Sequence, residues 1–296
     1  MRNAFIAPFM VLSVVTASGC ENDSYDLGTL LLTIDDGVLY PAGWSDDSAF
    51  VFATLHQGES WRIARINAAN GHYTLLDVGL ERAGVGDVHG NKLALESVED
   101  GGSDIYVFDQ NTEALVQVTD SSRYEWHPTF RPDGAAIAYD VSTKIGPDIY
   151  LQNLSGGTPV RITDHPESEQ ASQFSPNGKQ IAFHRRVNGS DDNYDMIIRD
   201  LESGTERAFA NTKENDSYPN WSPKGDRIVF SSNRTGEFNL FIVCTQSDGV
   251  QQLTYGSGNE KYPKWSPDGR SILYQSDSDS KKALYLIDAP TSLTCA

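Results

Sequence analysis

Short runs of alternating apolar and polar residues recur along the chain, whereas stretches with the 3.6-residue period of an amphipathic helix are scarce. Val116-Gln117-Val118-Thr119 and Val160-Arg161-Ile162-Thr163 are two of these runs. A period of two is typical of β-strands, whose successive side chains point to opposite faces. β-Branched residues are frequent and aromatic residues make up 10% of the sequence, which also favours strands. The pattern therefore predicts an all-β fold.

The alternating runs belong to a unit that occurs six times. In most copies a run ends in an aromatic residue, and a turn with Pro, Asp or Asn, and Gly follows. The turn position recurs every 42 to 47 residues, at Ser48, Gly90, Gly134, Gly178, Gly225 and Gly269. A period near 44 residues suits a blade of four short antiparallel strands. We therefore expect one six-bladed β-propeller domain over residues 28–296.

Two segments compete for the outer strand of the last blade. Within residues 29–33, Leu32 precedes Trp44 by the interval that separates Leu253 from Trp265, so this segment has the spacing of an outer strand. Pairing them with the last blade would close the ring and remove open sheet edges. Residues 290–294 also resemble an outer strand, and both segments cannot fill one place. In the other blades, outer strands are expected at residues 116–119, 160–163 and 251–254.

The sequence Trp265-Ser266-Pro267-Asp268-Gly269, followed by an alternating strand, resembles the repeat of TolB-type propellers. This family is related to the propellers of prolyl-oligopeptidase-like enzymes and oligogalacturonate lyases. The resemblance covers nearly all of the chain after Asp26 and is strongest in the last four copies. TolB carries a further α/β domain before its propeller, for which we expect no room here. The resemblance implies a periplasmic platform that binds other proteins.

The first residues read as a targeting sequence. Arg2 precedes the apolar run Ala4–Ala17, which suits the central region of a signal peptide. Small residues then lead to Cys20 and resemble a lipobox. We expect a signal peptide at 1–19, lipid on Cys20, and a lipidated spacer at 20–27. Glu21 favours a periplasm-facing location on the outer membrane of a bacterial envelope. The alternative is an ordinary secretory signal that ends near a cysteine.

The net charge limits the classes of partner that we expect, and the cysteines raise the question of a disulfide. The net charge of −18 would repel a phosphate backbone, so we expect no nucleic-acid binding. We expect a monomer that contacts the membrane through its lipid alone. In an oxidising compartment Cys244 and Cys295 could form a disulfide, although a buried free thiol at Cys244 fits the sequence equally well.

An acidic residue recurs just before the inner strand in four copies. Each lies two residues before a position in the following strand, giving the pairs Glu125 and His127, Glu169 and Ala171, Asp216 and Tyr218, and Glu260 and Tyr262. The expected outcome is a partial acidic ring at the mouth of the channel, where a basic peptide or a metal ion could bind. The simpler interpretation is that these carboxylates cap turns and face water. We take the carboxylates with His127, Tyr218 and Tyr262 as the candidate binding site.

Catalytic signatures are weak. The Gly-x-Ser-x-Gly elbow of the related hydrolases does not occur in the sequence. The six histidines lie at different positions of the repeat, so a three-histidine metal site is not expected. We therefore expect a non-catalytic scaffold without a cofactor or metal. The alternative is a carbohydrate-active or metal-dependent enzyme resembling oligogalacturonate lyase.

Overall fold

The computed structural model describes residues 28–99, 102–210, 212–247, 249–278, 282–291 and 295. Every helix or strand assigned within these ranges is a β-strand. Across the same ranges, we find no helix with the length and apolar character needed to span a bilayer. The expected signal peptide, Cys20 and the spacer lie outside the described residues.

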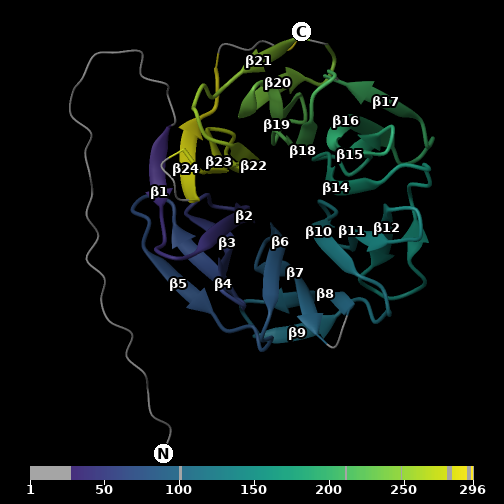
Figure 1. The fold of residues 1–296 in the computed structure, drawn as a ribbon. Helices are drawn as coiled ribbons and strands as arrows, with labels where there is room; N and C mark the ends of the chain where they lie inside the picture. Colours follow the sequence, from purple (N-terminus) through teal and green to yellow (C-terminus); the bar gives the residue numbers. More distant parts are fainter. Residues whose placement is uncertain are drawn as a thin grey trace, which may run out of the picture.

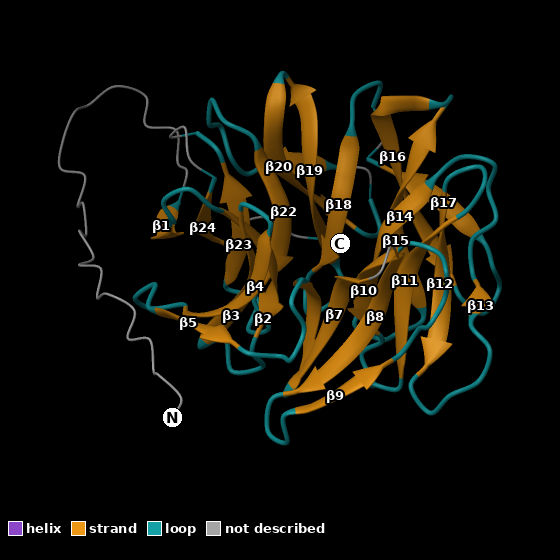
Figure 2. Cartoon of the chain, turned by 60° about the horizontal axis from the view of Figure 1, so that its bottom comes forward, coloured by secondary structure: helices purple, strands orange, loops and turns teal. Residues whose placement is uncertain are grey.

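Six four-stranded antiparallel sheets stand around a common axis, which confirms the predicted propeller (Figure 1). Blades 1 to 5 each use four consecutive strands, β2–β5, β6–β9, β10–β13, β14–β17 and β18–β21. Blade 6 combines β22–β24 with β1. In the tilted view of Figure 2, the blades appear as twisted ribbons of strands joined by loops.

Each blade has an inner strand at the axis, two middle strands and an outer strand. The inner strands are β2 (Val38–Trp44), β6 (Ala83–His89), β10 (Glu125–Phe130), β14 (Glu169–Phe174), β18 (Asp216–Trp221) and β22 (Glu260–Trp265). The second strands are β3 (Phe50–Gln57), β7 (Lys92–Glu99), β11 (Ala136–Ser142), β15 (Gln180–Val187), β19 (Arg227–Thr235) and β23 (Ser271–Ser276). The third strands are β4 (Ser60–Asn67), β8 (Gly102–Asp109), β12 (Pro147–Asn153), β16 (Ser190–Asp200), β20 (Glu237–Cys244) and β24 (Ala283–Asp288). The outer strands are β1 (Thr29–Leu32), β5 (Tyr73–Leu76), β9 (Ala114–Gln117), β13 (Val160–Arg161), β17 (Glu206–Phe209) and β21 (Val250–Gln252).

The N-terminal strand closes the ring. β1 pairs with β24 through Thr29 with Leu286, Leu30 with Tyr285 and Leu32 with Leu284. Gly28 precedes it with φ of +72°, and a Cβ there would lie 2.2 Å from the carbonyl oxygen of Leu286. The place for which residues 290–294 competed is therefore filled from the N-terminus. Residues 292–294 lie outside the described part of the chain.

The turn after each inner strand explains the repeat alignment. Gly134 has φ of 66°, and Ser48, at the same position of blade 1, takes a φ of 58°. Glycine adopts this left-handed conformation without steric cost, whereas serine does so less readily. The backbone therefore follows the same path in a copy that lacks the glycine.

Three outer strands end two residues earlier than predicted, because a threonine side chain replaces the end of the backbone ladder. The hydroxyls of Thr119, Thr163 and Thr254 accept hydrogen bonds of 2.8 to 2.9 Å from backbone N–H groups of the third strand. The prediction that strands extend to these threonines was wrong by two residues in each blade. Their side chains nevertheless satisfy the backbone of the neighbouring strand.

The aromatic residues that end the inner strands pack between blades. Trp265, 8% exposed, joins Ile272 and Tyr274 of its own blade and Val229 and Ile242 of blade 5 in one cluster. Trp44 and Phe130 are likewise buried. Burial of such surface is the main favourable contribution to folding. The interpretation of these residues as core is confirmed.

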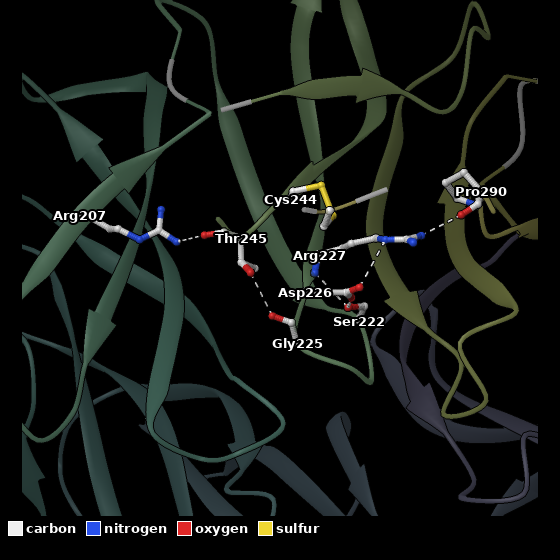
Figure 3. The surroundings of a disulfide bond; sticks show 9 residues. Arg207, Ser222, Gly225, Asp226, Arg227, Cys244, Thr245 and Pro290 are labelled. Carbon is white, nitrogen blue, oxygen red and sulfur yellow. Dashed lines mark hydrogen bonds and ion pairs between the residues drawn. A yellow bond between two sulfur atoms is a disulfide. The ribbon is translucent and has the colours of Figure 1, made fainter. Parts of the chain in front are cut away.

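The C-terminal end is fastened to blade 5 (Figure 3). Cys244, the last residue of β20, forms a disulfide with Cys295, with 5.5 Å between their Cα atoms. Nearby, the Arg227 guanidinium donates a 2.8 Å hydrogen bond to the carbonyl oxygen of Pro290. These contacts tie the segment that follows blade 6 back to its neighbour.

Candidate functional site

A cavity of about 310 Å³ lies on the propeller axis and receives side chains from all six inner strands. Tyr40, His127, Tyr218 and Tyr262 are among the residues that line it. Convergence on one point follows from the radial arrangement of the blades (Figure 1). Such a concave site with a few polar groups is where a ligand is expected to bind.

A β-bulge directs the inner-strand side chains to the axis. In blades 3 to 6 the ladder between the inner and second strands is interrupted for two residues. The first of the two has positive φ in every case: 50° at His127, 55° at Ala171, 55° at Tyr218 and 58° at Tyr262. A bulge leaves a residue unpaired and re-aims its side chain. Non-glycine residues with positive φ are uncommon. Four of them at one register indicate that the bulge has a role other than pairing the two strands.

Polar side chains of the preceding blade hold the bulges in place. The His127 N–H donates to Glu96 Oε2 at 2.8 Å, and the Ala171 N–H donates to Asp140 Oδ2 at 2.9 Å. The Tyr218 N–H points at His184 Nδ1 at 3.5 Å. The acceptors occupy one register of the second strands, where the six blades carry Thr54, Glu96, Asp140, His184, Ser231 and Gln275. This register therefore supplies a polar side chain in every blade.

His127 and Asp140 form the closest side-chain pair at the cavity. His127 Nδ1 lies 2.8 Å from Asp140 Oδ2, and the His127 side chain is 43% exposed while that of Asp140 is fully buried. Burial alone would lower the pKa of His127, but the hydrogen bond and charge of Asp140 outweigh it and raise the pKa. Burial raises the pKa of Asp140, and its Oδ1 has no hydrogen-bond partner among the described residues.

Aromatic rings form a continuous arc, of which Tyr40, Tyr218 and Tyr262 line the cavity while His184 is buried beside Tyr218. The ring centroids of His184 and Tyr218 are 5.3 Å apart, those of Tyr218 and Tyr262 4.4 Å, and those of Tyr262 and Tyr40 5.7 Å. We call these four residues, from blades 4, 5, 6 and 1, the aromatic arc. Burial lowers the pKa of His184 to about 3, so its imidazole is neutral at physiological pH.

A lysine and an aspartate lie further along the inner strands. Lys264 lines the cavity, and burial lowers its pKa while the charge of Asp87 acts in the opposite direction. Burial raises the pKa of Asp87, whose Oδ2 accepts hydrogen bonds from the Phe130 N–H at 2.8 Å and the Thr129 hydroxyl at 3.1 Å. The two charges therefore compensate each other at this level of the channel.

The four repeated carboxylates occupy a different place from the one expected. Glu125 is 4% exposed, and Glu169, Asp216 and Glu260 are 0% exposed. None of the four is among the residues that line the cavity. They therefore do not form the exposed acidic ring that their register suggested, because at the start of the strand these side chains turn into the protein.

Each carboxylate instead fastens the loop that leads into its blade. Glu169 accepts a 3.2 Å hydrogen bond from the His165 N–H, and Asp216 accepts one of 3.2 Å from the Thr212 N–H, both in the preceding loops. Within their own blades, Glu169 also pairs with Arg185 and Asp216 with Arg234. Glu125 accepts a 2.7 Å hydrogen bond from Ser121 in that loop. The hydroxyls of Thr254 and Ser276 donate to Glu260 at 3.2 and 3.1 Å. The interpretation as turn caps fits this arrangement, but the carboxylates are buried and do not face water.

His127, Tyr218 and Tyr262 do line the cavity, whereas Tyr40, Trp61, Glu96 and Lys264 were missed. Glu96 follows the apolar run Leu93-Ala94-Leu95, at the register where Asp140 and His184 also interrupt apolar runs. That recurrent polar position was the available signal. Among the described residues, no group of three or more His, Cys, Asp or Glu side chains is arranged to hold a metal ion.

Known structures share this architecture. The chain superimposes on a protein assigned as TolB from Agrobacterium tumefaciens with a TM-score of 0.67 and 19% identity, covering 86% of this chain and 91% of the other. For TolB from Acinetobacter baumannii the TM-score is 0.69 and the identity 22%, over 80% of this chain and 59% of the other. An oligogalacturonate lyase from Vibrio parahaemolyticus gives a TM-score of 0.58 and 15% identity, over 88% and 93%. At these identities the likeness shows the fold alone.

Comparison of the sequence with models of protein families is more specific than the likeness to known structures. No curated protein sequence matches the chain. The model described as "TolB beta propeller domain" matches residues 79–216 and 190–294, which together make up more than half of the sequence. The chain therefore belongs to the TolB β-propeller family.

Proposed function

We propose that the protein is a lipid-anchored scaffold of the bacterial cell envelope that binds a protein or peptide partner in its axial cavity without catalysing a reaction. The observation that carries the proposal is the bulge repeated in four blades, which brings His127, Tyr218 and Tyr262 to one cavity. Tyrosine rings supply large contact areas at a low cost in side-chain entropy and are enriched at protein interfaces.

The proposed location rests on the N-terminal sequence. The apolar run that ends at Cys20 is the basis for export and lipid attachment, and Glu21 for the periplasmic face of the outer membrane. The family membership is consistent with a role in the envelope. The protein would then present its cavity to partners in the periplasm.

Ala171 offers a direct test, because it is the small member of a register that otherwise carries His127, Tyr218 and Tyr262 in blades 3, 5 and 6. Ala171→Tyr adds a ring to the cavity at a backbone position that accepts tyrosine in blades 5 and 6. Co-purification from solubilised envelope should lose the partner with this variant. Ala114→Tyr, on the exposed outer strand β9, is the matched control and should keep it. An identical set of co-purified proteins from both variants would contradict the proposal.

The His127–Asp140 pair favours one other function. An imidazole oriented by a buried carboxylate is an arrangement suited to general base catalysis. The alternative is therefore a carbohydrate-active enzyme of the lyase type. Incubation with uronate oligosaccharides, in the presence and absence of divalent cations, tests it. Formation of unsaturated products that is abolished by His127→Gln would favour this alternative over the scaffold.

A further inference from the structure

The cavity has two chemically different sides. The aromatic arc belongs to blades 4, 5, 6 and 1, while Glu96 comes from blade 2. In the ring of six blades, blade 2 stands opposite blade 5 (Figure 1). Glu96 and Tyr218 both line the cavity and come from these two opposite blades. A ligand on the axis is therefore flanked by π-systems and by a carboxylate.

Only one of the two carboxylate oxygens of Glu96 accepts a hydrogen bond from the described residues. Its Oε2 accepts the hydrogen bond of the His127 N–H, which fixes the carboxylate in place. No hydrogen bond to its Oε1 is present among the described residues, and this oxygen lies against Gly84, where a Cβ would be only 3.2 Å away. Asp140 also has an oxygen without a hydrogen-bond partner, Oδ1, but its side chain is fully buried and it is not among the residues that line the cavity. Glu96 is thus the acid that faces the cavity with spare acceptor capacity.

The positive charge of Lys264 does not cancel the negative charge of Glu96. The charge of Asp87 raises the pKa of Lys264 against the effect of burial, so we treat these two residues as one compensating pair. With His127 and Asp140 as a second compensating pair, Glu96 leaves the site with negative charge. The chain as a whole carries a net charge of −18, which attracts basic partners toward any opening on its surface.

We infer that the cavity binds a cationic side chain, arginine or lysine, from an exposed segment of the partner. The three tyrosines of the aromatic arc would contact the alkyl stem and the cationic group, and Glu96 would accept its N–H hydrogen bonds. Aromatic faces attract such cations, and a charge-assisted hydrogen bond adds direction. The volume of about 310 Å³ suits one side chain or a ligand of that size better than a folded element. This inference rests on the proposed binding function and names its ligand class.

Two capped tripeptides serve as probes, N-acetyl-Gly-Arg-Gly-amide and its citrulline counterpart, which has nearly the same shape without the charge. In NMR titrations of the propeller, the arginine peptide should bind at least tenfold more tightly than the citrulline peptide. Glu96→Gln should weaken binding of the arginine peptide at least tenfold. It keeps an acceptor for the His127 N–H, so the bulge should be preserved. Glu202→Gln, in the exposed turn after β16, is the matched control and should bind like the unaltered protein.

Equal binding of both peptides, equal binding by Glu96→Gln and Glu202→Gln, or no binding of the arginine peptide would each overturn the inference. The comparison of the two peptides on the unaltered protein stands even if Glu96→Gln folds poorly. The proposed function fails separately, when Ala171→Tyr leaves the co-purified partners unchanged. Loss of partners in Ala171→Tyr without any discrimination of charge would retain the scaffold and reject its cationic ligand.

Discussion

Asp140 Oδ2 accepts two hydrogen bonds at once, one from the Ala171 N–H of the next blade and one within its own blade from His127. Because this carboxylate is fully buried, its charge acts on the imidazole with little screening by water. The pair therefore links the bulges of two neighbouring blades at the wall of the cavity.

The first prediction concerns the titration of His127. In the unaltered protein its pKa should lie above the ordinary value of 6.5, since the hydrogen bond and charge of Asp140 favour the protonated ring despite burial. Asp140→Asn removes the charge and should lower this pKa. NMR titration of the imidazole resonances measures both values. An unchanged pKa in Asp140→Asn would show that the pair does not control the imidazole.

Glu260 should make folding stability depend on pH. Burial raises its pKa from 4.5 to about 7, so the folded protein holds this proton more tightly than the unfolded chain. The resulting stabilisation is complete below pH 4.5 and is lost as the pH rises through 7. Relative to Glu260→Gln, the unaltered protein should lose on the order of 2–3 kcal/mol of unfolding free energy between pH 4.5 and 8. Denaturant unfolding across this range measures the difference.

Glu202→Gln is the control for this experiment, because that side chain is exposed. Its stability should follow the unaltered protein across the whole pH range. If Glu260→Gln did the same, the buried proton on Glu260 would be ruled out.

The disulfide should contribute to stability through the chain it closes. Cys244 and Cys295 are separated by 51 positions, and a cross-link over a loop of this size is worth about 2–4 kcal/mol. Cys295→Ser should lower the unfolding free energy by that amount, as measured in guanidinium chloride. Reductant should destabilise the unaltered protein to a similar extent and leave Cys295→Ser unaffected. Sensitivity of Cys295→Ser to reductant would contradict this assignment.

Cys20 should determine whether the protein is recovered in the membrane fraction or in the soluble fraction. Cys20→Ala removes the thiol that would carry the lipid, so the protein should move from the membrane to the soluble fraction of fractionated cells. Cys295→Ser, which also removes a cysteine, should stay with the membrane. Retention of Cys20→Ala in the membrane fraction would argue against lipidation.

The fold was largely predictable from the sequence, because the repeat fixes the number, order and spacing of the strands. The interval from residues 29–33 to Trp44 correctly assigned β1 to the edge of a blade. The ends of the outer strands were less predictable. Thr119, Thr163 and Thr254 have high strand propensity but bond through their hydroxyls, which a pattern of residue types does not distinguish.

The site was only partly predictable, for a geometric reason. Glu125, Glu169, Asp216 and Glu260 share a register, but register alone does not say whether a side chain faces the channel or the interior. The bulge two residues later changes the direction of His127, Tyr218 and Tyr262, and alternation cannot anticipate it. Glu96 lies on a second strand and reaches the cavity beside the next blade, which required the three-dimensional structure.

The pairing of β1 with β24 also determines how the domain would respond to a force on its N-terminal end. β1 is the first strand after the N-terminal residues, and three residue pairs hold it to β24. If the chain is tethered upstream of Gly28, a pull on the tether loads these pairs before any other part of the propeller. A pull directed along β1 would act on the hydrogen bonds between β1 and β24 together, in shear, because they lie across the strand direction. The seam that completes the ring is thus also the point at which an applied force would enter the domain.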